Sequence, residues 1–320
     1  MKRILLSLLI IAGIGGAMVA GTRAFFSDTE TSPNNTLAAG TIDISVDGQN
    51  PWTKTYLTTD LDDLKPGMNK TITFPVKNEG VNDLVLWKRI NIKVRDEGLN
   101  TEPECLAEQG TWSGTNCTGG TRKTDVDSRI HYDMTLRLEN MIPMAWNVMM
   151  SDIDQLWIPL GKIAPGETVQ VTQVYKLDDL TGNEYQGDKL TFDIDLYAEQ
   201  LKGPGPSHTT RGVVLDNKSL DSEGNYVYPI IDQTLGILTW DTAGTYSLRA
   251  FGLTGSQYQL ARWDGTTQTM FGSTVIPSGG KVTSSGSYSF VSYTDAKYWL
   301  RDTSGSWPSA SALWESNLVN

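Results

Sequence analysis

Polar and apolar residues alternate along much of the chain between residues 41 and 198. Successive side chains of a half-buried strand point to opposite faces of its sheet, so apolar residues then recur at every second position. The pattern predicts strands, and an antiparallel sandwich is the natural way to bury their apolar faces. The alternating segments are 41–46, 71–76, 91–94, 132–138, 168–175 and 190–198.

Two of these segments follow nearly the same turn sequence. Leu-Lys-Pro-Gly at 64–67 precedes the segment 71–76, and Ile-Ala-Pro-Gly at 163–166 precedes the segment 168–175. Proline and glycine suit the two central positions of a type II turn, because the second of these positions requires a positive φ. We therefore expect matching tight turns before both strands. Pro75 predicts an edge or bulged position in its strand.

The Met-rich segment 141–157 departs from the alternating period. Pro143 suits the first position of a helix, and the apolar residues after it fall roughly on one helical face. The segment therefore predicts a helix or loop packed over the end of the sandwich, with a Met-rich binding surface as the alternative. The apolar face consists of Trp146, Met149, Met150, Ile153 and Leu156.

The first 24 residues predict an export signal. Lys2 and Arg3 precede an apolar run at 4–20, and small residues at Thr22 and Ala24 fit a cleavage site, so Phe25 would become the first residue of the mature chain. An uncleaved membrane anchor is the alternative, although a run of about 17 residues lies at the lower limit for spanning a bilayer. Both interpretations predict a secreted or cell-surface protein, which contacts the membrane only if the signal stays in place.

Length and charge narrow the class of protein. The 320 residues suffice for two domains, and 31 glycines fit an all-β chain with many tight turns. The net charge is −11, and removal of a signal with three basic and no acidic residues would make it −14. Because phosphate binding needs a basic face, this charge argues against nucleic acid as a partner.

The two cysteines predict a disulfide. Cys105 and Cys117 lie in a polar loop with eleven residues between them, and cysteines of an exported protein meet an oxidising compartment. Closing a loop of this size contributes about 3 kcal/mol on the chain-entropy account. A metal pair is the alternative, but neighbouring ligands are missing because the only histidines are His131 and His208.

A search for catalytic motifs gives little. The sequence contains no H-E-x-x-H zinc motif, no G-x-S-x-G elbow and no P-loop. Two sets of acids could gather around calcium, but neither has EF-hand spacing, so solvated turn acids are favoured. The sets are Asp60, Asp62 and Asp63, and Asp178, Asp179 and Asp188. We therefore predict no catalytic residue, no cofactor and no metal.

A second β module follows a linker. Residues 202–210 are too rich in proline and glycine for a regular element, and strand candidates resume at 236–240, 246–251, 257–263 and 296–301. The module is rich in tryptophan, which raises the idea of carbohydrate stacking, but we favour aromatics that fill the core of the module. The residues concerned are Trp240, Trp263, Trp299, Trp307 and Trp314.

Several stretches resemble the TasA/camelysin family of fibre-forming matrix and surface proteins. Residues 24–44 have the form A-x-F-S-D-x-E-x-S-x-x-N-x-L-x-A-G-T-I-D-I of the start of the mature chain, and the stretches 62–71, 157–168 and 183–200 are similar to later parts of the family pattern. The resemblance covers most of residues 1–201. It implies a signal at 1–24 and a jelly-roll-like sandwich at 25–201. The β-sandwich module expected beyond the linker, at 211–320, is a departure from the family pattern, as is the loop from Cys105 to Cys117.

The resemblance also implies a function. Fibre-forming members donate an N-terminal segment to a groove in the next subunit, so we expect a structural subunit of extracellular fibres or biofilm matrix, with the segment 25–46 as donor strand. Other copies of the chain are the expected partner, with cell-envelope or matrix components as further partners. A camelysin-like surface metallopeptidase and a monomeric, glycan-binding adhesin remain as alternatives. The apolar donor residues are Phe25, Phe26, Leu37, Ile42 and Ile44.

Overall fold

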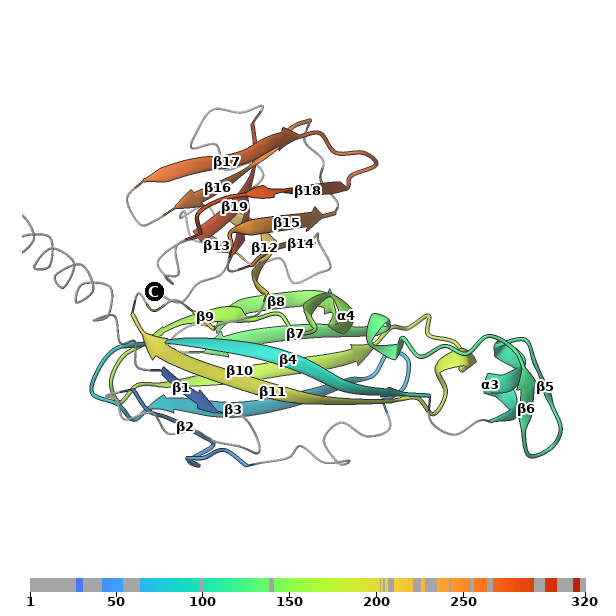
Figure 1. Cartoon of the computed structure of the whole chain (residues 1–320). Coiled ribbons are helices and arrows are strands. Elements are labelled where there is room, and N and C mark those ends of the chain that lie inside the picture. The colour runs from blue at the N-terminus through green and yellow to red at the C-terminus, as the bar shows by residue number, and fades with distance from the viewer. Residues whose placement is uncertain are drawn as a thin grey trace, which may run out of the picture.

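The protein is described by a computed structural model, in which two β-rich bodies and a small projecting arm, residues 101–121, can be followed (Figure 1). The all-β prediction is confirmed, since most described residues lie in antiparallel sheets. The described residues are 27–30, 42–53, 64–97, 101–137, 141–201, 203, 205–206, 210–220, 226–227, 235–241, 243–251, 253, 256–263, 267–290, 297–303 and 313–316.

Two antiparallel sheets form the larger body, which we call the sandwich. One sheet has the order β1-β11-β4-β9 and the other the order β2-β3-β10-β7-β8. The first consists of β1 (Ser27–Glu30), β11 (Lys189–Gln200), β4 (Leu84–Asp96) and β9 (Ile158–Ile163). The second consists of β2 (Ile44–Val46), β3 (Asn69–Asn78), β10 (Thr168–Leu177), β7 (Ile130–Arg137) and β8 (Met141–Met149).

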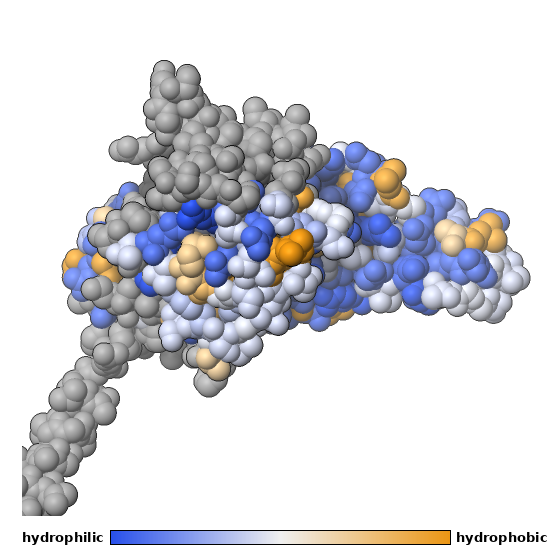
Figure 2. Space-filling view, turned by 90° about the horizontal axis from the view of Figure 1, so that it is seen from above, coloured by the Kyte–Doolittle hydropathy of each residue, from blue (hydrophilic) through white to orange (hydrophobic). Residues whose placement is uncertain are grey.

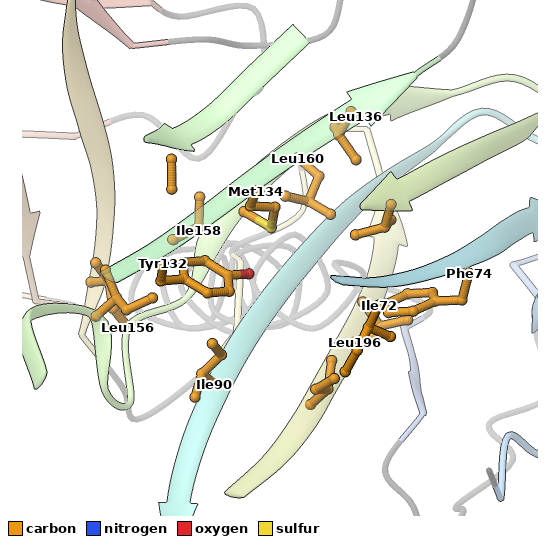
Figure 3. Packing of buried hydrophobic residues seen from close by; sticks show 14 of the residues in the cluster. Ile72, Phe74, Ile90, Tyr132, Met134, Leu136, Leu156, Ile158, Leu160 and Leu196 are labelled. Carbon is orange, nitrogen blue, oxygen red and sulfur yellow. The ribbon is translucent and has the colours of Figure 1, made fainter. Parts of the chain in front are cut away.

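The alternation seen in the sequence places the core between these sheets. Along β10 every second residue is buried, from Val169 to Leu177. Figure 3 shows Ile72 and Phe74 of β3 close to Leu196 of β11 within this core. Each fully buried side chain of this size contributes about 1.5–3 kcal/mol, so the shared apolar layer is what holds the two sheets face to face.

Both predicted turns are present. Gly67 and Gly166 have a φ of 76° each, and the closing hydrogen bonds run from Met68 N to Lys65 O (2.8 Å) and from Glu167 N to Ala164 O (3.0 Å). The turns lie at opposite ends of the β3–β10 ladder, because Gly67 N donates to Leu177 O and Gly166 N donates to Asn78 O. They therefore fix both ends of the central strand pair.

The helix predicted for residues 141–157 is wrong for most of its length. Residues Met141–Met149 form strand β8, which pairs with β7, and only α4 (Met150–Ile153) is helical. Pro143 is tolerated because β8 is an edge strand. Strands β12 and β14 of the second body also lie close to β8, a contact between distant segments that a local pattern cannot show.

The second body is one antiparallel sheet of nine strands in the order β17-β16-β19-β20-β12-β14-β15-β18, with β13 beside β12. Its two end strands, β17 and β18, lie close to each other. Tyr246 of β15 also packs edge-on against Phe271 of β17, with ring centroids 5.6 Å apart. The strands are β12 (Arg211–Leu220), β13 (Tyr226–Val227), β14 (Leu235–Trp240), β15 (Thr245–Ala250), β16 (Tyr258–Trp263), β17 (Gln268–Val275), β18 (Val282–Ser287), β19 (Lys297–Asp302) and β20 (Leu313–Ser316).

The second body, which we call the C-terminal module, rests on the β8–β9 side of the sandwich. Val214 and Ile237 of the module are buried in the same apolar cluster as the sandwich core. Trp157 N donates to Thr210 O (3.1 Å), and an ion pair of 2.7 Å joins Arg249 to Asp152. Apolar, main-chain and ionic contacts thus join the two bodies.

Candidate functional site

The N-terminal strand lies at the edge of its sheet. β1 pairs only with β11, in an antiparallel register that runs from Ser27 opposite Glu199 to Glu30 opposite Leu196. Four residues with a partner on one side make few hydrogen bonds, and such short edge elements belong to the least stable part of a fold. This edge is where the predicted donor segment meets its own sandwich.

The same N-terminal segment supplies an edge strand to both sheets, because β2 lies at the edge of the second sheet. The β2 region is held firmly. Ile42, Ile44 and Val46 are buried in the core, and Ser45 Oγ donates to Glu79 Oε1 at 2.8 Å. From Ile42 onward the segment is therefore anchored in its own subunit.

The predicted donor residues fall into two groups. Ile42 and Ile44 are 4 % and 0 % exposed within their own sandwich. The other three, Phe25, Phe26 and Leu37, lie outside the described residues, as does the predicted cleavage site at Ala24 and Phe25. Among the described residues, no helix has the length and apolar character needed to cross a membrane.

A buried acid lies beneath the end of the β1–β11 pair. Glu199 is fully buried and accepts hydrogen bonds from Trp87 Nε1 (3.0 Å) and Gly205 N (2.9 Å). Burial raises the pKa of Glu199 to about 7, against the lowering effect of these hydrogen bonds and of the charge of Arg211. Arg211 in turn donates to Pro206 O (2.8 Å). These contacts fix the start of the C-terminal module beside the β11 edge.

Sequence reasoning missed this cluster. Ala198 beside Glu199 packs in the sandwich core, so the period of two places Glu199 on the outer face of the sheet and gives no sign that this face is covered there. The only hint is the Gly-Pro-Gly-Pro stretch at 203–206, which allows the backbone to approach closely.

A second unusual group lies in the core between the sheets. Lys88 is 2 % exposed and donates to the hydroxyl of Tyr132 (2.7 Å), which donates to Gln173 Oε1 (2.7 Å). Burial lowers the pKa of Lys88 to about 7. Since the chain of hydrogen bonds links β4, β7 and β10 inside the core, we assign it a structural role.

The predicted disulfide is present. Cys105 and Cys117 are bonded, with their Cα atoms 5.6 Å apart. The bond joins α3 (Glu102–Ala107) to β6 (Cys117–Gly119), which pairs with β5 (Gly110–Trp112). This arm projects from one end of the sandwich (Figure 1). A Cβ at Gly110 would lie 2.8 Å from the Cys105 sulfur, so the crossing requires glycine.

The acid sets considered for calcium do not gather. Asp178 accepts from Leu180 N (2.8 Å) and lies 3.7 Å from His131, while Asp179 pairs with Lys176. Asp188 lies elsewhere, at the start of β11. Asp60, Asp62 and Asp63 fall outside the described residues, as does His208. Within the described ranges, no group of three histidine, cysteine or acidic residues is arranged to hold a metal ion.

Two of the five tryptophans of the C-terminal module can be placed, and both are buried. Trp240 stacks on Phe290 with ring centroids 4.7 Å apart, and Trp299 is 5 % exposed. Trp240 packs in the apolar core of the module, whereas Trp299 is buried outside that cluster. The side chains of Trp263, Trp307 and Trp314 lie outside the described part of the structure.

One family model matches the chain. The family is described as camelysin metallo-endopeptidase, and the match covers residues 1–205, which span the sandwich and the residues before it. No curated protein matches the chain.

Proposed function

The chain belongs to the camelysin metallo-endopeptidase family, and from this premise we propose that it is an exported structural subunit that polymerises by donating its N-terminal segment to a neighbouring copy. The observation that carries the proposal is the contrast between β1, a four-residue edge strand, and the buried anchor that begins at Ile42. The family supports a surface or secreted location, and the polymer is our inference.

Exchange of β1 between copies conserves its contacts. When β1 leaves, the main-chain groups of β11 from Leu196 to Glu199 lose their partner on that side. The β1 of a second copy has the same sequence and can restore the same register on β11. Forming the polymer therefore costs few contacts. The competing state is the closed monomer, in which each chain keeps its own β1.

The segment between donor and anchor is long enough for this exchange. Eleven residues, 31–41, separate Glu30 from Ile42. When extended they span at most about 36–40 Å, which exceeds the width of a small sandwich. A donor strand can therefore reach the β11 edge of a neighbour while β2 stays in its own core. For this reason we place the exchanged part before Ile42.

The experiment compares two variants of the mature chain by electron microscopy and sedimentation. Replacement of Asp28 and Thr29 by proline removes the backbone N–H donors of both central residues of β1 and should abolish filaments without unfolding the sandwich. Replacement of both by alanine is the matched control and should leave filaments intact. Deletion of residues 25–39 should behave like the proline variant. Filaments of normal yield from the proline variant would remove the donor-strand mechanism.

The family description favours a second candidate, a surface metallo-endopeptidase. Against it stands the absence of an H-E-x-x-H motif from the whole sequence. Hydrolysis of a casein substrate by the purified mature protein, abolished by a chelator and restored by zinc, would favour the peptidase. We expect no hydrolysis that depends on a metal.

A further inference from the structure

Three segments meet at the base of the arm. Helix α3 packs against the 3-10 turn η2 (Asn183–Tyr185). Beside this contact, Thr101 Oγ1 donates to Gln186 Oε1 (3.3 Å). Lys189, the first residue of β11, lies opposite Asp96, the last residue of β4, in the strand register. Hydrophilic residues gather on the surface between the sandwich and the arm in the view from above (Figure 2). The arm is therefore held to the sandwich by a polar junction.

Two carboxylates in this junction keep buried oxygen atoms without a partner. Glu104 is fully buried, and although its Oε2 accepts from Thr101 N (3.1 Å), its Oε1 has no hydrogen-bond donor. Asp188 has both carboxylate oxygens buried and unpartnered. A buried charged oxygen without a donor is strongly unfavourable, so three such atoms in one junction need an explanation.

Helix α3, which carries Glu104, packs against η2, which ends three residues before Asp188. Burial and then the negative charge of Glu104 are the two largest causes that raise the pKa of Asp188, to about 7. Glu104 has its own pKa raised, first by burial.

The neighbouring charged groups have other partners. Arg122 bonds Glu97 (2.6 Å) and Glu108 (3.0 Å), and Asp125 accepts from Ser128 Oγ (3.0 Å) and the Tyr185 hydroxyl (3.1 Å). The charges of Glu97, Glu108 and Asp125 all act on Asp188 in the same direction as that of Glu104. Acidic side chains therefore outnumber basic ones at this junction. The carboxylate oxygens without a hydrogen-bond donor belong to Glu104 and Asp188.

We infer that Glu104 and Asp188 bind a hard divalent cation of the calcium type, which fastens the disulfide-bonded arm to the sandwich. Calcium takes oxygen ligands only and accepts a bidentate carboxylate in irregular geometry, whereas magnesium demands a near-ideal octahedron. The protein offers the two oxygens of Asp188 and one of Glu104. This inference does not depend on the proposed polymer.

The expected affinity is modest. With two carboxylates and no third acidic or histidine ligand in the described part of the chain, water and backbone carbonyls must complete the coordination. Extracellular sites of this kind have Kd values of about 10⁻⁴–10⁻³ M. An exported protein can use such a site only where calcium is at millimolar levels, as it is outside cells.

The test follows thermal unfolding of the mature protein, stripped with a chelator, at pH 8. Calcium at tenfold excess over its Kd should raise Tm by about 2–4 °C, and magnesium should do less. Asp188→Asn should raise Tm in the absence of calcium, because it removes the repulsion, and should abolish the calcium shift. Glu104→Gln keeps an oxygen that accepts from Thr101 N. It should raise the calcium concentration needed for the rise in Tm at least tenfold.

Asp179→Asn is the matched control. Asp179 lies in the same loop region but is 66 % exposed and pairs with Lys176, so the calcium shift should persist in this variant. Terbium luminescence sensitised by Tyr185 gives an independent readout, and calcium should compete it away. An unchanged Tm with calcium in the wild-type protein would overturn the inference. So would a calcium shift that survives in Asp188→Asn, since calcium would then bind elsewhere on the protein.

Discussion

Leu156 of the sandwich lies directly against Gly212 of the C-terminal module. A Cβ atom added at Gly212 would lie 2.8 Å from Leu156 Cδ1 and 2.7 Å from the backbone oxygen of Leu238. Gly212→Val should therefore force the bodies apart and lower the free energy of unfolding by about 1–3 kcal/mol. Calorimetry checks this, with Ser247→Val on an exposed position of β15 as control. A Gly212→Val protein that melts like the wild type would contradict the tight junction.

Glu199 predicts a loss of stability with rising pH. Burial raises its pKa from an ordinary 4.5 to about 7, so the folded protein holds a proton that the unfolded chain releases in this interval. The contribution to the free energy of unfolding is complete below about pH 4.5 and lost as the pH passes 7, on the order of 3 kcal/mol. Urea unfolding of Glu199→Gln should show a flatter profile between pH 4.5 and 7 than the wild type. Identical profiles would remove Glu199 as the cause.

For Lys88 we expect stability to rise with pH, the opposite of the change caused by Glu199, and at higher pH values. Burial lowers its pKa from an ordinary 10.5 to about 7, so between these values the unfolded chain binds a proton that the folded protein lacks. Stability should then rise as the pH increases from 7 towards 10.5. Lys88→Met should lose this rise in denaturant titrations and be at least as stable at pH 7. Lys93→Met, on the exposed face of the same strand, should keep the rise.

The disulfide should stabilise the arm and leave the sandwich intact. Replacing Cys105 and Cys117 by serine removes a loop constraint of about 3 kcal/mol, and the loss should be confined to residues 101–121 because only this arm is crosslinked. Hydrogen exchange followed by mass spectrometry should show faster exchange there and unchanged protection in β10. Ser113→Ala, in the loop of the arm, serves as control. Faster exchange throughout the sandwich would contradict a local role.

Ionic strength should accelerate polymerisation. The processed chain would carry a charge of −14, and like-charged subunits repel each other until salt reduces the screening length to about 10 Å near 0.1 M. Light scattering should therefore grow faster in 150 mM than in 10 mM sodium chloride. Sucrose at equal osmolarity should have no such effect. Slower growth at higher salt would mean that attraction between charges drives assembly.

The sequence predicts best where one face of a strand is buried and the other is wet. The segment 168–175 has this environment, and it is the centre of β10. The Pro-Gly turns were predictable for a local reason, because Gly67 and Gly166 adopt the positive φ that their turn requires. In both cases the physical cause lies within a few residues.

Predictions failed where distant segments decide the environment. Residues 141–149 form a strand because β7 pairs with them and the C-terminal module covers them, and neither partner is visible in a local pattern. Glu199 is buried because Trp87 and the backbone at Gly205 approach it from other segments. The unpartnered oxygens of Glu104 and Asp188 likewise become visible only when α3 and the start of β11 are placed together.

The seating of the C-terminal module has a consequence for what a fibre would display. The module covers the β8–β9 side, whereas β1 and β2 are the strands at the other end of each sheet. In a filament of the proposed kind every subunit would carry its module at one fixed orientation, repeated once per subunit. A ligand that binds a single module weakly then meets many copies at high effective concentration. Avidity along the filament would therefore hold a ligand that a single module binds only weakly.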